Sequence, residues 1–263
     1  MRPKIKEFRM NLSPSSSLYA RHTSALNNPA LVDPEQRPAF GVRIADIAAL
    51  LPDGSTVFGQ RKIPTTKQFD QAFGAFAQGT LFQAPSGFVA VEDLRPGDQL
   101  TTSGGGQQTV VWIGCATFAP SDLGTRMTLT RVMADSFGVN RPQSFLSLGT
   151  AARVLQTPAG MRGVAGDQKL MTPASQFVDG VNVIEVAPPT PIRLFHVALR
   201  HHAPMIAGGL EVESFHPGTQ PLQMLSHTLR SVYLSVFPHI ENLSDFGTLC
   251  APRAPDEDSQ SAA

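Results

Sequence analysis

Residues 79–98 of the chain are Gly79-Thr-Leu-Phe-Gln-Ala-Pro-Ser-Gly-Phe-Val-Ala-Val-Glu-Asp-Leu-Arg-Pro-Gly-Asp98, and Gln-Leu-Thr-Thr-Ser-Gly-Gly-Gly-Gln-Gln-Thr-Val-Val leads on to Trp112. Apolar and β-branched residues gather between turn formers, which predicts short strands over 80–84, 88–91 and 109–113. Pro85-Ser86-Gly87 and Arg95-Pro96-Gly97-Asp98 place Pro and Gly where tight turns need them. Short strands separated by tight turns indicate a mainly β fold.

The composition is that of a globular protein. The chain has 263 residues, of which 41% are hydrophobic and 16% are charged, so it can bury a substantial core. Lys plus Arg and Asp plus Glu both total 21, and no basic surplus predicts a nucleic-acid partner. No apolar run reaches the roughly 18 residues of a membrane span, and no apolar segment follows the basic N-terminus. We therefore expect a cytoplasmic protein, or one exported without a classical signal peptide.

The cysteine content favours no metal or redox motif. Cys115 and Cys250 are far apart in sequence and do not form a Cys-x-x-Cys pair, so we expect two unpaired thiols, with a disulfide between them as the alternative. His201, His202 and His216 could collect as metal ligands with Glu213, but we predict neither a metal nor any other cofactor.

Composition shifts divide the chain into five segments. We predict a disordered arm over residues 1–37, a small N-terminal β extension over 38–71, a main domain over 72–218, an amphipathic helix over 219–240 and a disordered tail over 241–263. The helix rests on a three- and four-residue spacing of apolar side chains, namely Leu222, Leu225, Leu229, Val232 and Val236.

The order of motifs resembles that of Hint domains, the self-cleaving module shared by inteins and hedgehog C-terminal regions, and most of all the bacterial hedgehog/intein-like subfamily. The resemblance covers residues 73–240. It is carried by Gly79 to Asp98, by Val110-Val-Trp-Ile-Gly114, by Leu170 to Gly180 and by Glu213-Ser-Phe215. It implies a Hint-type β-horseshoe with short helices and a C-terminal amphipathic helix.

The resemblance also identifies two catalytic positions that have lost their reactive groups. Family members carry a nucleophilic Cys a few residues before Gly-Thr, and here that position is Ala75. Their Ser-Pro-x-His-Arg block aligns with Gly149 to Arg153, which puts Ala152 in place of the catalytic His. Self-cleavage needs a side chain that attacks a carbonyl and an acid that protonates the leaving amide. Neither group is present at these positions.

Two other residues are candidate remnants of the site. Thr150 could donate to an oxyanion, or it could cap a turn. His202 aligns with the family's third-block His, and Arg200 replaces the Asp of that block, which we expect to disfavour a protonated ring. His196 alternates with apolar neighbours and is predicted to be a satisfied, partly buried residue.

These positions lead to two expected functions. In the first, the protein no longer cleaves itself and acts as a binding or structural module with an unknown protein partner. In the alternative, it still cleaves by a non-standard route, with Cys115 or a nucleophile outside the domain, and with His202 as acid. A third interpretation, an unrelated small-ligand β-barrel, would require a deep apolar pocket.

Overall fold

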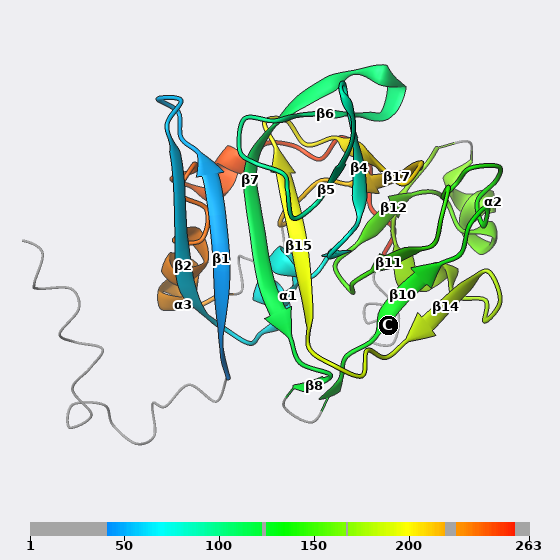
Figure 1. Cartoon of the computed structure of the whole chain (residues 1–263), viewed down its shortest axis with the longest axis horizontal. Coiled ribbons are helices and arrows are strands. Elements are labelled where there is room, and N and C mark those ends of the chain that lie inside the picture. The colour runs from blue at the N-terminus through cyan, green and yellow to red at the C-terminus, as the bar shows by residue number, and fades with distance from the viewer. Residues whose placement is uncertain (1–40, 123–124, 167, 219–224, 256–263) are drawn as a thin grey trace, which may run out of the picture. The chain divides into compact units, whose positions relative to one another are not determined.

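The computed structural model describes residues 41–122, 125–166, 168–218 and 225–255. Within them the fold is mainly β, as the mixture of turns and short strands predicts, and every pairing between named strands is antiparallel (Figure 1). The predicted arm, residues 1–37, lies outside the described residues.

The larger sheet has nine strands, with β6 paired to β7 beside the main path. In spatial order its strands are β14 (Val183–Val186), β10 (Leu129–Val132), β11 (Leu146–Leu148), β3 (Phe76–Ala77), β15 (Ile192–Leu199), β7 (Gln107–Phe118), β1 (Val42–Leu50) and β2 (Thr56–Pro64), with β6 at Gln99–Thr101.

A second sheet has six strands, and a further pair stands alone. The six are β13 (Met171–Pro173), β12 (Arg153–Leu155), β17 (Leu210–Glu213), β16 (Pro204–Ala207), β4 (Leu81–Ala84) and β5 (Gly87–Ala90), and the pair is β8 (Ser121–Asp122) with β9 (Thr125–Arg126). Strands β16 and β17 are consecutive in the chain and form an antiparallel hairpin.

Helical segments are short. They are α1 (Lys67–Phe73), α2 (Arg162–Ala165) and α3 (His227–Leu234), with 3₁₀ turns at Ser103–Gly105, Ala159–Met161, Ala174–Phe177 and Leu243–Phe246. None of the helices in the described part of the chain has the length and apolar character of a membrane-spanning helix.

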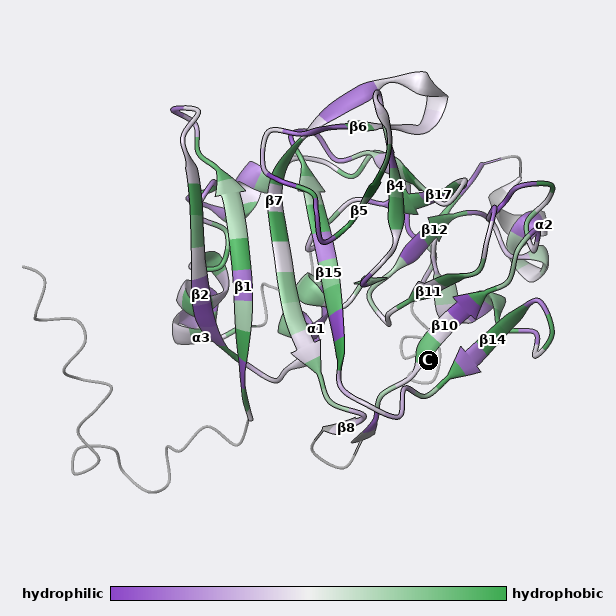
Figure 2. Ribbon diagram, viewed as in Figure 1, coloured by the Kyte–Doolittle hydropathy of each residue, from purple (hydrophilic) through white to green (hydrophobic). Residues whose placement is uncertain are grey.

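Strands β7 and β15 form the centre of the larger sheet, and β1 extends it. β7 pairs with β15 from Phe118 to Val110 and with β1 through five residue pairs. Strand β1 is mainly hydrophobic, whereas β2 at the sheet edge carries a hydrophilic stretch (Figure 2). Charged side chains suit an edge strand because they discourage pairing with other chains. The hairpin formed by β1 and β2 is therefore continuous with the central sheet.

Two clusters of buried side chains hold the layers together. One of them surrounds Trp112, which is fully buried and donates its Nε1–H to the Val236 carbonyl at 2.7 Å. Phe73 of α1, Phe215 and Phe237 have ring centroids 4.6–5.6 Å from that of Trp112. Helix α1 and the segment around α3 are thus packed into one core with β7.

Three predicted elements differ from the structure. The C-terminal helix begins at His227 because Ser226 caps it by accepting the Leu229 N–H at 3.3 Å. It is therefore shorter than the predicted 219–240, and Leu222 lies outside the described residues. The predicted β extension over 38–71 contains strands β1 and β2, but it also contains most of helix α1.

Thr172 lies in β13, where it pairs with Val154 of β12. Its hydroxyl donates to the Gln156 carbonyl at 2.7 Å. The 3₁₀ turn that follows has Pro173 at its N-cap position.

The predicted disordered tail, 241–263, is wrong for its described part. Asn242 and Asp245 form a reciprocal capping box that orders residues 243–246. Further on, Arg253 forms an isolated parallel bridge with Met171 and an ion pair with Glu213 at 2.9 Å. These contacts join residues far apart in sequence, so local composition gives no sign of them.

Candidate functional site

The peptide between Gly74 and Ala75 is clamped by hydrogen bonds. Gly74 ends helix α1. Its carbonyl accepts the Ala151 N–H at 3.1 Å, and the Ala75 carbonyl accepts the Gly149 N–H at 2.7 Å. On the other side, the Ala75 N–H donates to the Phe195 carbonyl at 3.1 Å. This peptide is thus fixed between β15 and the loop that begins at Gly149.

Close approach explains the glycine at position 149. A Cβ atom there would lie 2.1 Å from the Gly74 carbonyl oxygen and 2.9 Å from its carbonyl carbon. Any side chain would therefore push the loop away from the peptide that it holds.

The side chains of Ala75 and Ala152 are packed into the hydrophobic core. Ala75 has no exposed surface and Ala152 is 1% exposed, and both belong to one cluster with Phe76, Val154 and Ala174. Thr150, in contrast, is exposed. The two aligned positions therefore face apolar neighbours, and neither offers a group that can exchange a proton or attack a carbonyl.

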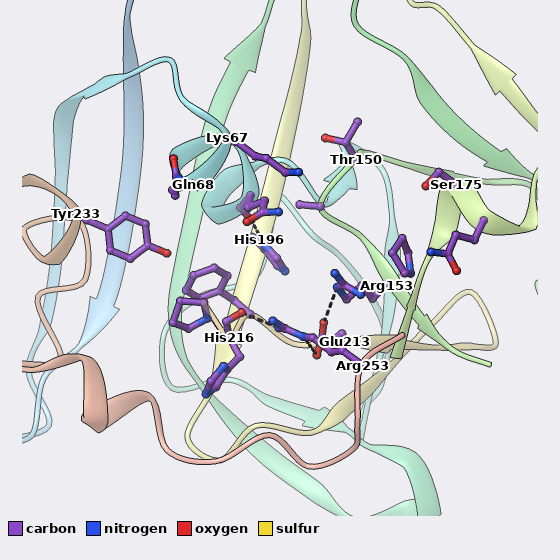
Figure 3. A pocket seen from close by; sticks show the side chains of 16 residues that line it. Lys67, Gln68, Thr150, Arg153, Ser175, His196, Glu213, His216, Tyr233 and Arg253 are labelled. Carbon is purple, nitrogen blue, oxygen red and sulfur yellow. Dashed lines mark hydrogen bonds and ion pairs between the residues drawn. The ribbon is translucent and has the colours of Figure 1, made fainter. Parts of the chain in front are cut away.

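A polar cavity of about 250 Å³ borders this clamp (Figure 3). Its wall is formed by α1, the loop after β11, the 3₁₀ turn after β13, strands β15 and β17, and the C-terminal segment. The residues that line it include Lys67, Gln71, Thr150, Ala151, Arg153, Ser175, Gln176, His196, Glu213, His216 and Arg253.

Glu213 is the centre of a buried ion-pair cluster at the cavity wall. Its side chain is 5% exposed and lies 2.9 Å from Arg253 Nε and 3.7 Å from Arg153 Nε (Figure 3). Burial alone raises the pKa of a carboxyl group, but His202 and Arg253 outweigh burial and lower the pKa of Glu213. The carboxylate is therefore ionised at neutral pH.

His196 presents one nitrogen to the cavity. Its Nδ1 lies 2.9 Å from the Gln71 carbonyl, and because a carbonyl can only accept, Nδ1 carries the proton. Burial lowers the pKa of His196 to about 4. The ring is therefore neutral at pH 7, and its Nε2 is a hydrogen-bond acceptor.

Residues 74–219 match the family model described as the Hint domain, a match that starts at the clamped Gly74. The chain belongs to the Hint domain family. No match was found among curated protein sequences.

Two solved structures are similar to part of the chain. The chain is similar to an intein-like domain from Clostridium thermocellum, at 12% identity and a TM-score of 0.36, over 54% of this chain and 99% of that domain. It is also similar to the MchDnaB-1 intein, at 15% identity and a TM-score of 0.31, over 54% of this chain and all of the intein.

His202 of this Hint protein lies in the ion-pair cluster but does not line the cavity. Burial lowers the pKa of its ring, but the adjacent Glu213 carboxylate outweighs burial and raises the pKa above its usual value. The expected lowering by Arg200 is therefore wrong. Arg200 is exposed, and it is Glu213 that lies beside the ring.

Two contacts bear on the protonation of His202. The backbone N–H of Cys250 points at Nδ1 at 3.0 Å, and an N–H can only donate. In the described geometry Nδ1 therefore accepts, and the ring carries a proton on Nε2. That atom is 3.2 Å from Glu213 Oε1, a close contact that falls short of a well-directed hydrogen bond. Protonation of Nδ1 would require the Cys250 amide to turn away.

The three histidines of the alternative metal site do not converge on one point. The rings of His202 and His216 lie 5.2 Å apart, but His216 donates from Nε2 to the Gly247 carbonyl and accepts the Gly218 N–H at Nδ1. His201 is exposed. Over residues 41–122, 125–166, 168–218 and 225–255, no group of His, Cys, Asp and Glu is arranged to hold a metal ion.

The two cysteines of this Hint protein are unpaired, and neither lines the cavity. Cys115 lies within β7 and is 4% exposed, and burial raises the pKa of its thiol. A neutral thiol is a weak nucleophile. Cys250 is exposed and contacts His202 through its backbone.

Sequence patterns alone do not reveal the cluster of Arg153, Glu213 and Arg253. The sequence suggests a role for Glu213 only because it lies near His216 in the chain. Arg253 lies in the segment that composition assigns to the disordered tail. The one local sequence signal for this cluster is Arg153, which follows Ala152 in the segment that aligns with the second Hint block. His196 is satisfied at Nδ1, as the sequence predicts, but it also faces the cavity.

Proposed function

We propose that this Hint domain does not cleave itself, and that the cavity beside the uncut Gly74–Ala75 peptide is a binding site. Support comes first from the chemistry at the two aligned positions. A methyl group at Ala75 cannot attack the Gly74 carbonyl, and a methyl group at Ala152 cannot protonate the leaving amide. One backbone donor, the Ala151 N–H, still holds that carbonyl, but a single donor cannot replace a nucleophile and an acid that act together.

The main support for the proposal is that the residues before Gly74 are packed into the core of the domain. In a processing domain, the residues before the cleaved bond are a flanking segment that the reaction separates from the domain. Here, strand β1 pairs with β7 over five residue pairs, and α1 buries Phe69 and Phe73 in the cluster around Trp112. Residues 42–73 are therefore part of the core, and a break at Gly74 would not release them.

The cavity supports the binding half of the proposal. Most of its lining side chains are polar or charged and lie outside the two hydrophobic clusters, and Phe215 and Tyr233 of the cluster around Trp112 complete the wall. A cavity that combines aromatic side chains with polar groups that can fix the orientation of a ligand is typical of a binding site.

Residual cleavage by another route is the alternative. It would use Cys115 or an outside nucleophile, with His202 as acid. Cys115 is buried and the pKa of its thiol is raised, and both properties count against Cys115 as the nucleophile. Both ring nitrogens of His202 contact other groups, namely Glu213 and the Cys250 amide. These contacts count against His202 as the acid that protonates the leaving amide.

The mass of the denatured chain tests the proposal. The full-length protein is incubated for days with dithiothreitol and, separately, with hydroxylamine, which captures ester and thioester intermediates. We expect the full-length mass alone. Fragments that end at Gly74 would reject the proposal, and a parallel C115S/C250S double variant would then show whether a thiol of this chain is the nucleophile.

A further inference from the structure

We infer that a groove around Arg131, separate from the cavity beside Gly74, binds a small organic acid that has an apolar body and one carboxylate group. The Arg131 groove has a volume of about 410 Å³. Part of its wall comes from β10, β11 and β14, which lie side by side at one end of the larger sheet (Figure 1). No described residue lines both this groove and the cavity beside Gly74, so the inference goes beyond the proposed function.

The wall of the groove is largely apolar, and part of it is exposed. Leu81, Phe88 and Phe145 are 46%, 52% and 59% exposed, and they come from β4, β5 and the segment before β11. Exposed apolar side chains are ordinary when they are scattered, but here three large ones from different elements line one groove. Residues 188–191, Pro-Pro-Thr-Pro, add a stiff wall with few N–H groups. The lining therefore favours a ligand with an apolar body.

Backbone hydrogen bonds fix the shape of this wall without a ligand. The Gln143 N–H donates to the Gly208 carbonyl at 2.8 Å, and the Gly208 N–H donates to the Leu81 carbonyl at 2.9 Å. These bonds join the turn between β16 and β17 to β4 and to the segment before β11, and all three residues line the groove. A preformed site loses less conformational entropy on binding than a mobile one.

Arg131 supplies the charge of the groove. Among the described residues it is the only charged side chain that lines it. Its guanidinium carbon lies 5.1 Å from the centre of the Phe145 ring, and its Nε donates to the Ser147 hydroxyl at 3.4 Å. Within the part of the chain that the structure describes, neither Nη group of Arg131 donates a hydrogen bond to the protein. A guanidinium with two open Nη groups matches the two oxygens of one carboxylate.

The acidic residue closest in register does not neutralise Arg131. Glu185 of β14 pairs with Thr130, whereas Arg131 pairs with Ile184 on the same strand. Side chains alternate between the two faces of a sheet, so Glu185 and Arg131 lie on opposite faces. The charge of Arg131 is thus available to a ligand in the groove.

Volume and charge together select the class of ligand. A volume of about 410 Å³ lies within the roughly 300–1,000 Å³ of sites for small molecules, which are mostly apolar with a few polar groups that fix orientation. A phosphate dianion would bring two negative charges to a single cation. A small acid without an apolar part would leave Leu81, Phe88 and Phe145 uncovered. An aromatic or alkyl monocarboxylate satisfies both the charge and the lining.

The test is an NMR titration of the full-length protein at neutral pH with sodium phenylbutyrate and with sodium octanoate, at constant ionic strength. Phenylbutyramide has the body of phenylbutyrate without the charge, phenylbutylamine reverses the charge, and acetate has the carboxylate without the body. We expect saturable shifts with phenylbutyrate or octanoate at the amides of residues 79–81 and 143–147. Each of the other compounds should bind at least about tenfold more weakly than phenylbutyrate, because each lacks either the ion pair or the apolar contact.

Two variants with matched controls locate the binding. R131Q should weaken phenylbutyrate binding at least about tenfold, whereas R200Q, which changes an exposed arginine outside the groove, should leave it unchanged. F145A should weaken it severalfold, whereas F58A, which removes a phenylalanine that is 70% exposed and lies outside the groove, should leave it unchanged. If R131Q does not fold, the comparison of phenylbutyrate with its amide and its amine on the unchanged chain decides the role of charge.

The inference is overturned if neither acid binds saturably, if the amide or the amine binds as tightly as phenylbutyrate, or if R131Q behaves like R200Q. Sedimentation of the ligand-free chain adds one more outcome. Self-association that F145A abolishes and F58A does not would assign the groove to a second copy of the chain and would also overturn the inference. None of these results changes the expectation that the chain stays whole at Gly74, and cleavage there would leave this inference standing.

Discussion

Gly149→Ala should destabilise the protein more than any neighbouring glycine substitution, because Gly149 lies against the Gly74 carbonyl. The new Cβ would meet the Gly74 oxygen at 2.1 Å and Leu194 Cδ1 at 2.9 Å. The loop must move away, which weakens the hydrogen bonds from Gly149 to Ala75 and from Ala151 to Gly74. Two hydrogen bonds at about 1 kcal/mol each, plus about 1–3 kcal/mol for the forced displacement, give about 3–5 kcal/mol.

The matched control for this variant is Gly160→Ala. A Cβ at Gly160 would meet no atom within 4 Å, so its free energy of unfolding should change by less than about 0.5 kcal/mol. Urea unfolding followed by circular dichroism measures both variants, and the melting temperature of G149A should fall by at least about 6 °C for a chain of this size. If G149A costs no more than G160A, the loop does not clamp the Gly74–Ala75 peptide and the description of the site is wrong.

Three further predictions follow from the same contacts. Trp112→Phe should cost about 2–4 kcal/mol in urea unfolding, because it empties core volume and leaves the buried Val236 carbonyl without its 2.7 Å donor; a cost below about 1 kcal/mol would contradict the packing described. The free energy of unfolding should fall as the pH is lowered from about 6.5 toward 4, because the pKa of His196 is lower in the folded state and the unfolded state takes up the proton first. His196→Gln should remove about 2 kcal/mol of the stability loss between pH 7 and 5, and an unchanged pH dependence in this variant would refute the buried neutral ring. In A75C/A152H we expect thiol-dependent breakage at Gly74 on denaturing gels, while the two pieces co-elute in native size-exclusion chromatography because β1 stays paired with β7; separation of the pieces would show that the upstream segment is not part of the core.

The β fold could be predicted from sequence because its signals are local. Arg95-Pro96-Gly97-Asp98 fixes one chain reversal, and Val110 to Gly114 marks the central strand. The helix start at Ser226 was missed because the spacing of apolar residues extends past a capping serine, and spacing alone cannot tell which residues are helical. Helix α1 was missed because a seven-residue helix has little periodicity to detect, and its stability comes from packing Phe69 and Phe73 into the core.

The candidate site was predictable only where a motif carries it. The family pattern placed Ala75 and Ala152, and the structure describes both as buried. The cavity charges could not be predicted, because Glu213 and Arg253 are separated by 40 positions and meet only through tertiary folding. No local pattern records a contact of that range.

Backbone hydrogen exchange of the native protein tests most directly the claim that residues 42–73 and the Hint domain form one folding unit. The account predicts that amides of β1 and α1, together with those of Ala75, Gly149 and Ala151, exchange only through the same global opening as β7 and β15. Exchange of β1 and α1 through a separate opening of much lower free energy would contradict it, because that is the behaviour of a removable flanking segment.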